Sequence, residues 1–119
     1  MTCKISDMES AGRQTSVVSV AGDIDWANSP ELYAAIHHAL SGNHVSRLVV
    51  DLHGVNHIDS SGLGTLLDGL RTAKHMSVRF ILCGLENSLR RALERTRLST
   101  LFDICPTQQE ALGHFATNG

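Results

Sequence analysis

Two serines and two glycines follow an acidic residue in the middle of the chain, in the string Asp59-Ser60-Ser61-Gly62-Leu63-Gly64. Apolar residues precede this string and a helical pattern follows it, so we expect the serines to lie where a helix begins. The first backbone N–H groups of a helix have no partner within the helix, and its dipole makes this end positive. Such a position suits an oxyanion such as a phosphate group. The string is therefore a candidate site of binding or modification.

The two serines are expected to have different roles. The apolar helical pattern starts at Leu63, which favours Ser61 as the N-cap and leaves Ser60 outside the helix with a free side chain. Gly62 and Gly64 have no side chains, so that a partner can approach the backbone there. Taken alone, the string is more simply explained as a loop end and a capped helix that have no other function.

A second acidic segment, Gly22-Asp23-Ile24-Asp25, follows an earlier apolar run in the way that Ile58-Asp59-Ser60 follows a later one. If both runs are parallel strands, their carboxyl ends lie at the same edge of the sheet. The pattern therefore predicts that acidic side chains surround Ser60.

The elements that position these residues alternate along the chain. Apolar or β-branched runs predict strands over residues 15–21, 47–52, 78–83 and 101–105, with a weaker strand near 3–8. Helical patterns lie between them, starting at an N-cap at Ser29 and ending at Gly42, then over 61–75, 85–93 and 107–116. This alternation predicts a single α/β domain over residues 1–119, with a mixed, mostly parallel sheet and about four helices.

The composition excludes several classes of function. The chain has 119 residues and a formal net charge of -2, so it can bury a core and has no basic surface typical of nucleic-acid binding. No apolar run approaches the roughly 20 residues that cross a membrane, and the N-terminus has no secretory pattern. We therefore expect a soluble, cytoplasmic protein without a nucleic-acid or membrane partner.

The cysteines and histidines give no metal or cofactor prediction. Cys3, Cys83 and Cys105 have no CxxC spacing and are expected to be buried free thiols. His53 and His57 have the spacing of metal ligands on a helix, but the residues between them favour a loop.

Three segments together resemble the STAS domain of bacterial anti-sigma factor antagonists. They are Gly22-Asp23-Ile24-Asp25, the strand run Leu48-Val49-Val50-Asp51-Leu52, and Ile58 to Gly64 with its Asp-Ser-Ser-Gly motif. The resemblance extends over about residues 15–116. It implies an α/β fold and a protein that regulates transcription by partner switching.

In that family, a cognate anti-sigma factor that is also an ATP-dependent serine kinase phosphorylates the first serine of the motif. The resemblance therefore implies that Ser60 is the phosphorylation site, that Asp25 and Asp59 match the acidic positions of the family, and that the protein is not an enzyme. The switch surface expected around Ser60 comprises Asp23, Asp25, Asp59, Ser61, Gly62, Leu63 and Gly64.

Two other interpretations remain open at this point. The chain is also compatible with a STAS scaffold or sensor subunit in which Ser60 is never phosphorylated. More remotely, Ser60 and the histidines and aspartates suggest a serine hydrolase, but the Gly-x-Ser-x-Gly elbow of that class is missing.

Overall fold

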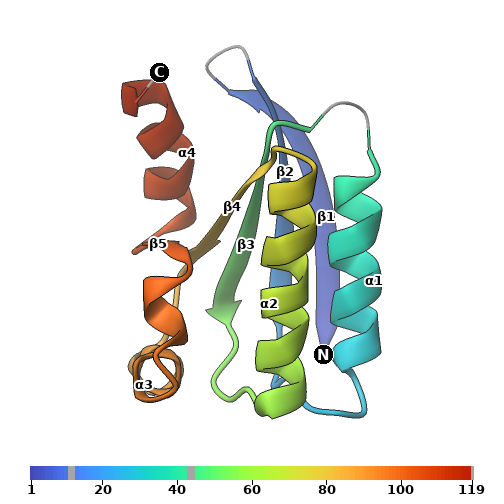
Figure 1. Cartoon of the computed structure of the whole chain (residues 1–119), viewed down its shortest axis with the longest axis vertical. Helices are drawn as coiled ribbons and strands as arrows, with labels where there is room; N and C mark the ends of the chain where they lie inside the picture. The colour runs from blue at the N-terminus through green and yellow to red at the C-terminus, as the bar shows by residue number, and fades with distance from the viewer. Residues whose placement is uncertain (11–12, 43–44, 119) are drawn as a thin grey trace.

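The computed structural model describes residues 1–10, 13–42 and 45–118, without the side chains of residues 10, 13 and 114–118. These residues form a sheet whose strands lie side by side in chain order (Figure 1). The strands are β1 Thr2–Ser10, β2 Arg13–Ala21, β3 Arg47–Gly54, β4 Arg79–Cys83 and β5 Asp103–Cys105. β1 is antiparallel to β2, and each later strand is parallel to the one before it.

Helices connect the parallel strands, and a further helix follows β5. They are α1 Ser29–Leu40, α2 Ser60–His75, α3 Asn87–Arg95 and α4 Gln108–Asn118, with a 3-10 turn at Leu98–Thr100. Because the parallel strands follow one another in order and such crossovers are right-handed, α1, α2 and α3 all lie on one face of the sheet. α4 packs against the other face through Ala111.

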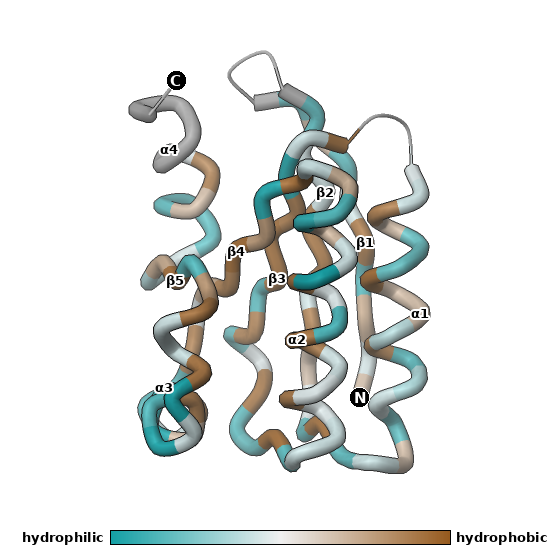
Figure 2. The backbone as a smooth tube through the Cα atoms, in the orientation of Figure 1, coloured by the Kyte–Doolittle hydropathy of each residue, from teal (hydrophilic) through white to brown (hydrophobic). Residues whose placement is uncertain are grey.

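The core lies mainly between the sheet and the first three helices. Alternate residues of a strand point to opposite faces. Val50 and Leu82 therefore point to α1 and α2, whereas Val49 and Ile81 point to α4, and all four are fully buried. Burial on both faces explains why β4 is hydrophobic along most of its length (Figure 2).

The predicted fold class is confirmed, since the structure has a mixed, mostly parallel sheet with helical crossovers. The weak first strand is a full strand that pairs along its whole length with β2. Within the described ranges, no helix is both long and apolar enough to cross a membrane.

Some predicted element boundaries were wrong by a few residues. Ser29 is the first residue of α1 and not its N-cap, which is Asn28. The reason is that the chain already turns at Asp25, whose carbonyl oxygen accepts the N–H of Ser29 at 2.7 Å. The last strand begins at Asp103, because a 3-10 turn at Leu98–Thr100 comes before it.

Candidate functional site

The segments that follow β2 and β3 meet at one edge of the sheet. Ile24 and Ile58 form an isolated parallel bridge beyond the ends of the strands. The N–H of Ile24 donates to the carbonyl of His57 at 2.9 Å, and the N–H of Asp59 donates to the carbonyl of Ile24 at 3.0 Å. The two acidic segments are thus held against each other by backbone hydrogen bonds.

Asp59 is the N-cap of α2, so the assignment of Ser61 to that position was wrong. Its backbone is extended, which lets the side chain fold back over the first turn, where Oδ1 accepts the N–H of Gly62 at 3.0 Å. Its other oxygen, Oδ2, accepts the N–H of Trp26 at 3.0 Å. One carboxylate therefore caps α2 and also ties the β2–α1 loop to it.

Ser60 and Ser61 are the first two residues of α2, and both are exposed. Ser60 was expected to lie outside the helix, and that part of the prediction was wrong. Both side chains nevertheless point to solvent, and no hydrogen bond to either hydroxyl is found in the described part of the chain. These hydroxyls are free for reaction or contact.

The two glycines of the motif have opposite environments. Gly62 is buried, and a Cβ atom there would lie 2.5 Å from Cγ1 of Ile58 and 2.7 Å from Cγ2 of Ile24. Gly62 therefore serves internal packing. The expectation that it opens the backbone to a partner was wrong. Gly64 is exposed, and a Cβ atom there would have nothing within 4 Å. Leu63, between them, is partly buried against the core.

The carboxylate of Asp25 shapes the β2–α1 loop. Its Oδ1 accepts the N–H groups of Ala27 at 2.9 Å and Asn28 at 3.0 Å. Asn28 in turn accepts the N–H of Asp25 and donates to the carbonyl of Asp23, each at 2.8 Å. Asp23 and Asp25 are both exposed, and among the described residues neither carboxylate is hydrogen-bonded to Ser60. The acidic loop thus lies beside the serine without engaging it.

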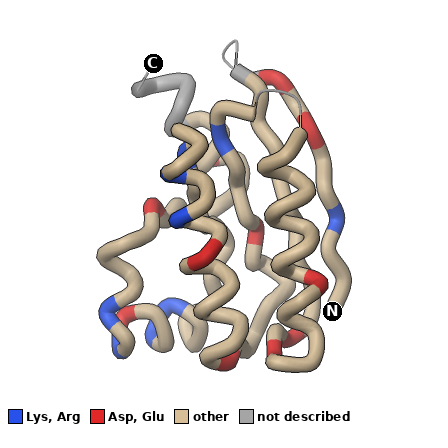
Figure 3. The backbone as a smooth tube through the Cα atoms, turned by 45° about the vertical axis from the view of Figure 1, so that its right-hand side comes forward, with Lys and Arg blue, Asp and Glu red and all other residues tan. Residues whose placement is uncertain are grey.

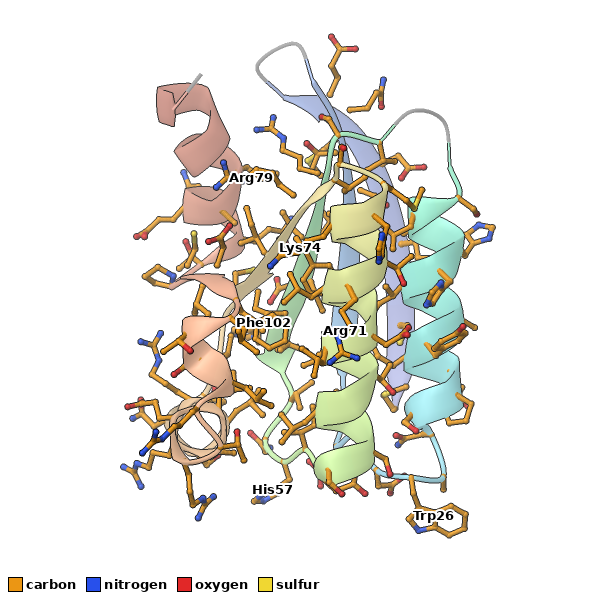
Figure 4. The ribbon with its side chains drawn as sticks, viewed as in Figure 1. Trp26, His57, Arg71, Lys74, Arg79 and Phe102 are labelled. Carbon is orange, nitrogen blue, oxygen red and sulfur yellow. The ribbon has the colours of Figure 1, made fainter. Side chains whose placement is uncertain are left out.

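Sequence reasoning missed Trp26, whose side chain is 76% exposed and points away from the body of the protein (Figure 4). The available signal was an aromatic residue within a polar loop, between Asp25 and Asn28. Acidic residues lie near the starts of α1 and α2, whereas α3 has both arginines and Glu94 (Figure 3). α3 is joined to the β3–α2 loop by a hydrogen bond from Ser88 Oγ to the carbonyl of Asn56 at 2.9 Å.

No cluster of three or more His, Cys, Asp or Glu side chains within the described residues is arranged to hold a metal ion. Cys83 is buried, whereas Cys3 and Cys105 are only partly buried, which corrects the prediction for those two. Burial, reinforced by the negative charge of Asp51, raises the pKa of the Cys83 thiol to about 12. A protonated thiol is a poor nucleophile, so Cys83 is an unreactive residue of the core.

The chain is similar to known proteins in sequence and in fold. The chain is 30% identical to the anti-sigma-B factor antagonist of Listeria monocytogenes over 100 residues, which are 83% of this chain and 86% of that protein. A crystal structure of an anti-sigma factor antagonist from Mycobacterium paratuberculosis is 30% identical, with a TM-score of 0.81 over 95% of this chain and 92% of that one.

The fold is also shared with more distant structures. The Bacillus cell fate determinant SpoIIAA, solved in its phosphorylated form, is 22% identical, with a TM-score of 0.71 over 96% of this chain and 99% of that one. The family model described as "STAS domain" matches residues 7–111. The resemblance seen in the three sequence segments is therefore confirmed, and the chain belongs to the STAS domain family.

Proposed function

We propose that this protein is an anti-sigma factor antagonist, which binds a cognate anti-sigma factor and is switched off when Ser60 is phosphorylated. The observation that carries the proposal is the free hydroxyl of Ser60, exposed at the start of α2 beside a residue that caps the helix. Curated relatives with the name anti-sigma factor antagonist support the class of partner.

The assignment to Ser60 rests on the motif as well as on exposure. Ser60 and Ser61 are both exposed, so accessibility does not distinguish them. Ser60 is the first serine of Asp-Ser-Ser-Gly, the position that the family resemblance assigns to the phosphate. We infer that Ser61, with Asp23, Asp25, Leu63 and Gly64, belongs to the surrounding partner-binding surface.

The effect of phosphorylation follows from the charge that it adds. A phosphate group adds about -1.5 to -2 charge and three acceptor oxygens. The positive end of α2 favours that charge by roughly 0.3 to 1 kcal/mol at an exposed position, so the fold tolerates it. A partner that fits closely over Ser60 and the neighbouring acidic loop instead gains an unpaired negative charge at the contact. Binding is the property that changes.

The chemistry of the switch belongs to the partner. We propose that the anti-sigma factor is a serine kinase that transfers the γ-phosphoryl group of ATP to Oγ of Ser60, with loss of the hydroxyl proton and release of ADP. This chain provides the acceptor and the docking surface and is not itself an enzyme. It would act in the cytoplasm, without direct contact to nucleic acid or membrane.

The hydrolase interpretation has little support in the site. A serine nucleophile needs a base within hydrogen-bonding distance. Among the described residues, no hydrogen bond joins an imidazole to Ser60 or Ser61. The site therefore gives no support for a serine hydrolase.

Incubation of the protein with its anti-sigma factor and ATP tests the proposal. Intact mass should show one added phosphoryl group, and peptide mapping should place it on Ser60. Ser60→Ala should abolish the addition, whereas the matched control Ser61→Ala should retain it. Phosphate found only on Ser61 would refute the site. No phosphate on either residue would favour the scaffold or sensor interpretation.

A further inference from the structure

Trp26 is the most exposed large hydrophobic side chain in the described part of the chain. It is 76% exposed, whereas Tyr33 and Leu101 are each 48% exposed and Met76 is 47% exposed. An indole has a large apolar surface that is unfavourable in water, and tryptophan is enriched among the residues that dominate protein interfaces. Its exposure therefore requires an explanation beyond the fold.

The backbone on both sides of Trp26 is fixed. The N–H of Trp26 donates to Oδ2 of Asp59, and the next two N–H groups donate to Oδ1 of Asp25. Asn28 closes the loop with two further hydrogen bonds, to the N–H of Asp25 and the carbonyl of Asp23. A side chain presented from a fixed backbone loses little conformational freedom when it is bound.

The same contacts place Trp26 next to the phosphorylation site. Asp59, which binds the N–H of Trp26, directly precedes Ser60 and caps the helix that begins there. A partner that covers the Ser60 hydroxyl therefore also reaches the β2–α1 loop. Trp26 and Ser60 belong to one continuous surface.

The charges around Trp26 indicate the chemistry of that partner. Asp23 and Asp25 are exposed in the same loop, and Glu31 is exposed in the first turn of α1. Acidic residues near the starts of α1 and α2 lie at this end of the molecule (Figure 3). A complementary surface has an apolar socket for the indole and Lys or Arg side chains opposite Asp23 and Asp25.

We propose that Trp26 anchors the interface with the anti-sigma factor, which receives the indole in an apolar socket, faces Asp23 and Asp25 with basic residues, and covers the Ser60 hydroxyl with a close-fitting surface that has no cation for a phosphate. This inference rests on the proposed function and assigns to Trp26 the largest contribution to the affinity for the anti-sigma factor. A phosphate on Ser60 then lies beside Trp26, where the bound partner has least room to move away from the added charge.

Titration of the purified cognate anti-sigma factor with Trp26→Ala tests this anchor. We expect an affinity at least about 30-fold weaker than that of the parent, which corresponds to a hot spot. Met76→Ala, which removes a similar apolar side chain from the opposite end of α2, should stay within about twofold of the parent. Circular dichroism should show that both variants are folded.

A second measurement uses the fact that Trp26 is the only tryptophan of the chain. In the 15N-labelled protein, its indole N–H gives a single cross-peak, which should shift when unlabelled anti-sigma factor is added. Suppose that the parent binds the anti-sigma factor and loses affinity on phosphorylation, while Trp26→Ala binds within threefold of the parent. The role of Trp26 as an anchor would then be refuted, and the proposed function would stand. A parent that binds no anti-sigma factor would overturn both.

Discussion

The first turn of α2 has an inner side, which packs against the protein, and an outer side, which faces solvent. On the inner side, Asp59 caps the helix and Gly62 packs against Ile24 and Ile58. On the outer side, Ser60 and Gly64 are exposed, and a Cβ atom at Gly64 would have nothing within 4 Å. The proposed function thus assigns stability and recognition to adjacent residues of one turn. This separation explains how a modification on the outer side can alter binding while the fold persists.

The comparison of Gly62 with Gly64 gives the largest predicted effect. Gly62→Ala would place a methyl group against the side chains of Ile24 and Ile58, and such overpacking typically costs about 1 to 3 kcal/mol of unfolding free energy. Gly64→Ala, the matched control, should stabilise the helix by about 0.5 to 1 kcal/mol, because alanine loses less backbone entropy. Urea denaturation of both variants measures the difference. Equal effects of the two substitutions would show that the two sides are not distinct.

The comparison of Asp59 with Ser61 gives the next effect. Asp59→Ala removes the cap of α2 and should cost about 0.5 to 2 kcal/mol of unfolding free energy, whereas Ser61→Ala should change it by less than about 0.5 kcal/mol. Asp59→Asn has only one oxygen for the two N–H groups that the carboxylate accepts, so it should be intermediate. Denaturant midpoints of the three variants provide the test. A greater loss in Ser61→Ala than in Asp59→Ala would restore Ser61 as the cap.

The fold was predictable because its signals are local. β-branched runs, turn residues and helical periods identified the strands and helices, and the rule for parallel strands placed the two acidic segments at one edge. The cap of α2 was not predictable from the same signals, because aspartate and serine are both good caps and the apolar period is compatible with a start at either.

The other errors concern contacts between residues that are distant in the chain. The role of Gly62 depends on Ile24, which the sheet topology brings against it, and no local pattern contains that contact. The position of the Trp26 backbone likewise depends on a hydrogen bond from its N–H to Asp59, 33 residues further along the chain. Both features depend in part on a contact with a remote segment of the chain.

The most direct test of the account is to phosphorylate Ser60 stoichiometrically and measure two quantities on the same sample. Calorimetric titration with the anti-sigma factor should show an affinity at least about tenfold weaker than that of the unmodified protein, which is about 1.4 kcal/mol. The denaturation midpoint should be almost unchanged, because the phosphate lies on the outer side of α2. Unchanged affinity, or a loss of affinity that accompanies unfolding, would contradict the separation of binding from stability.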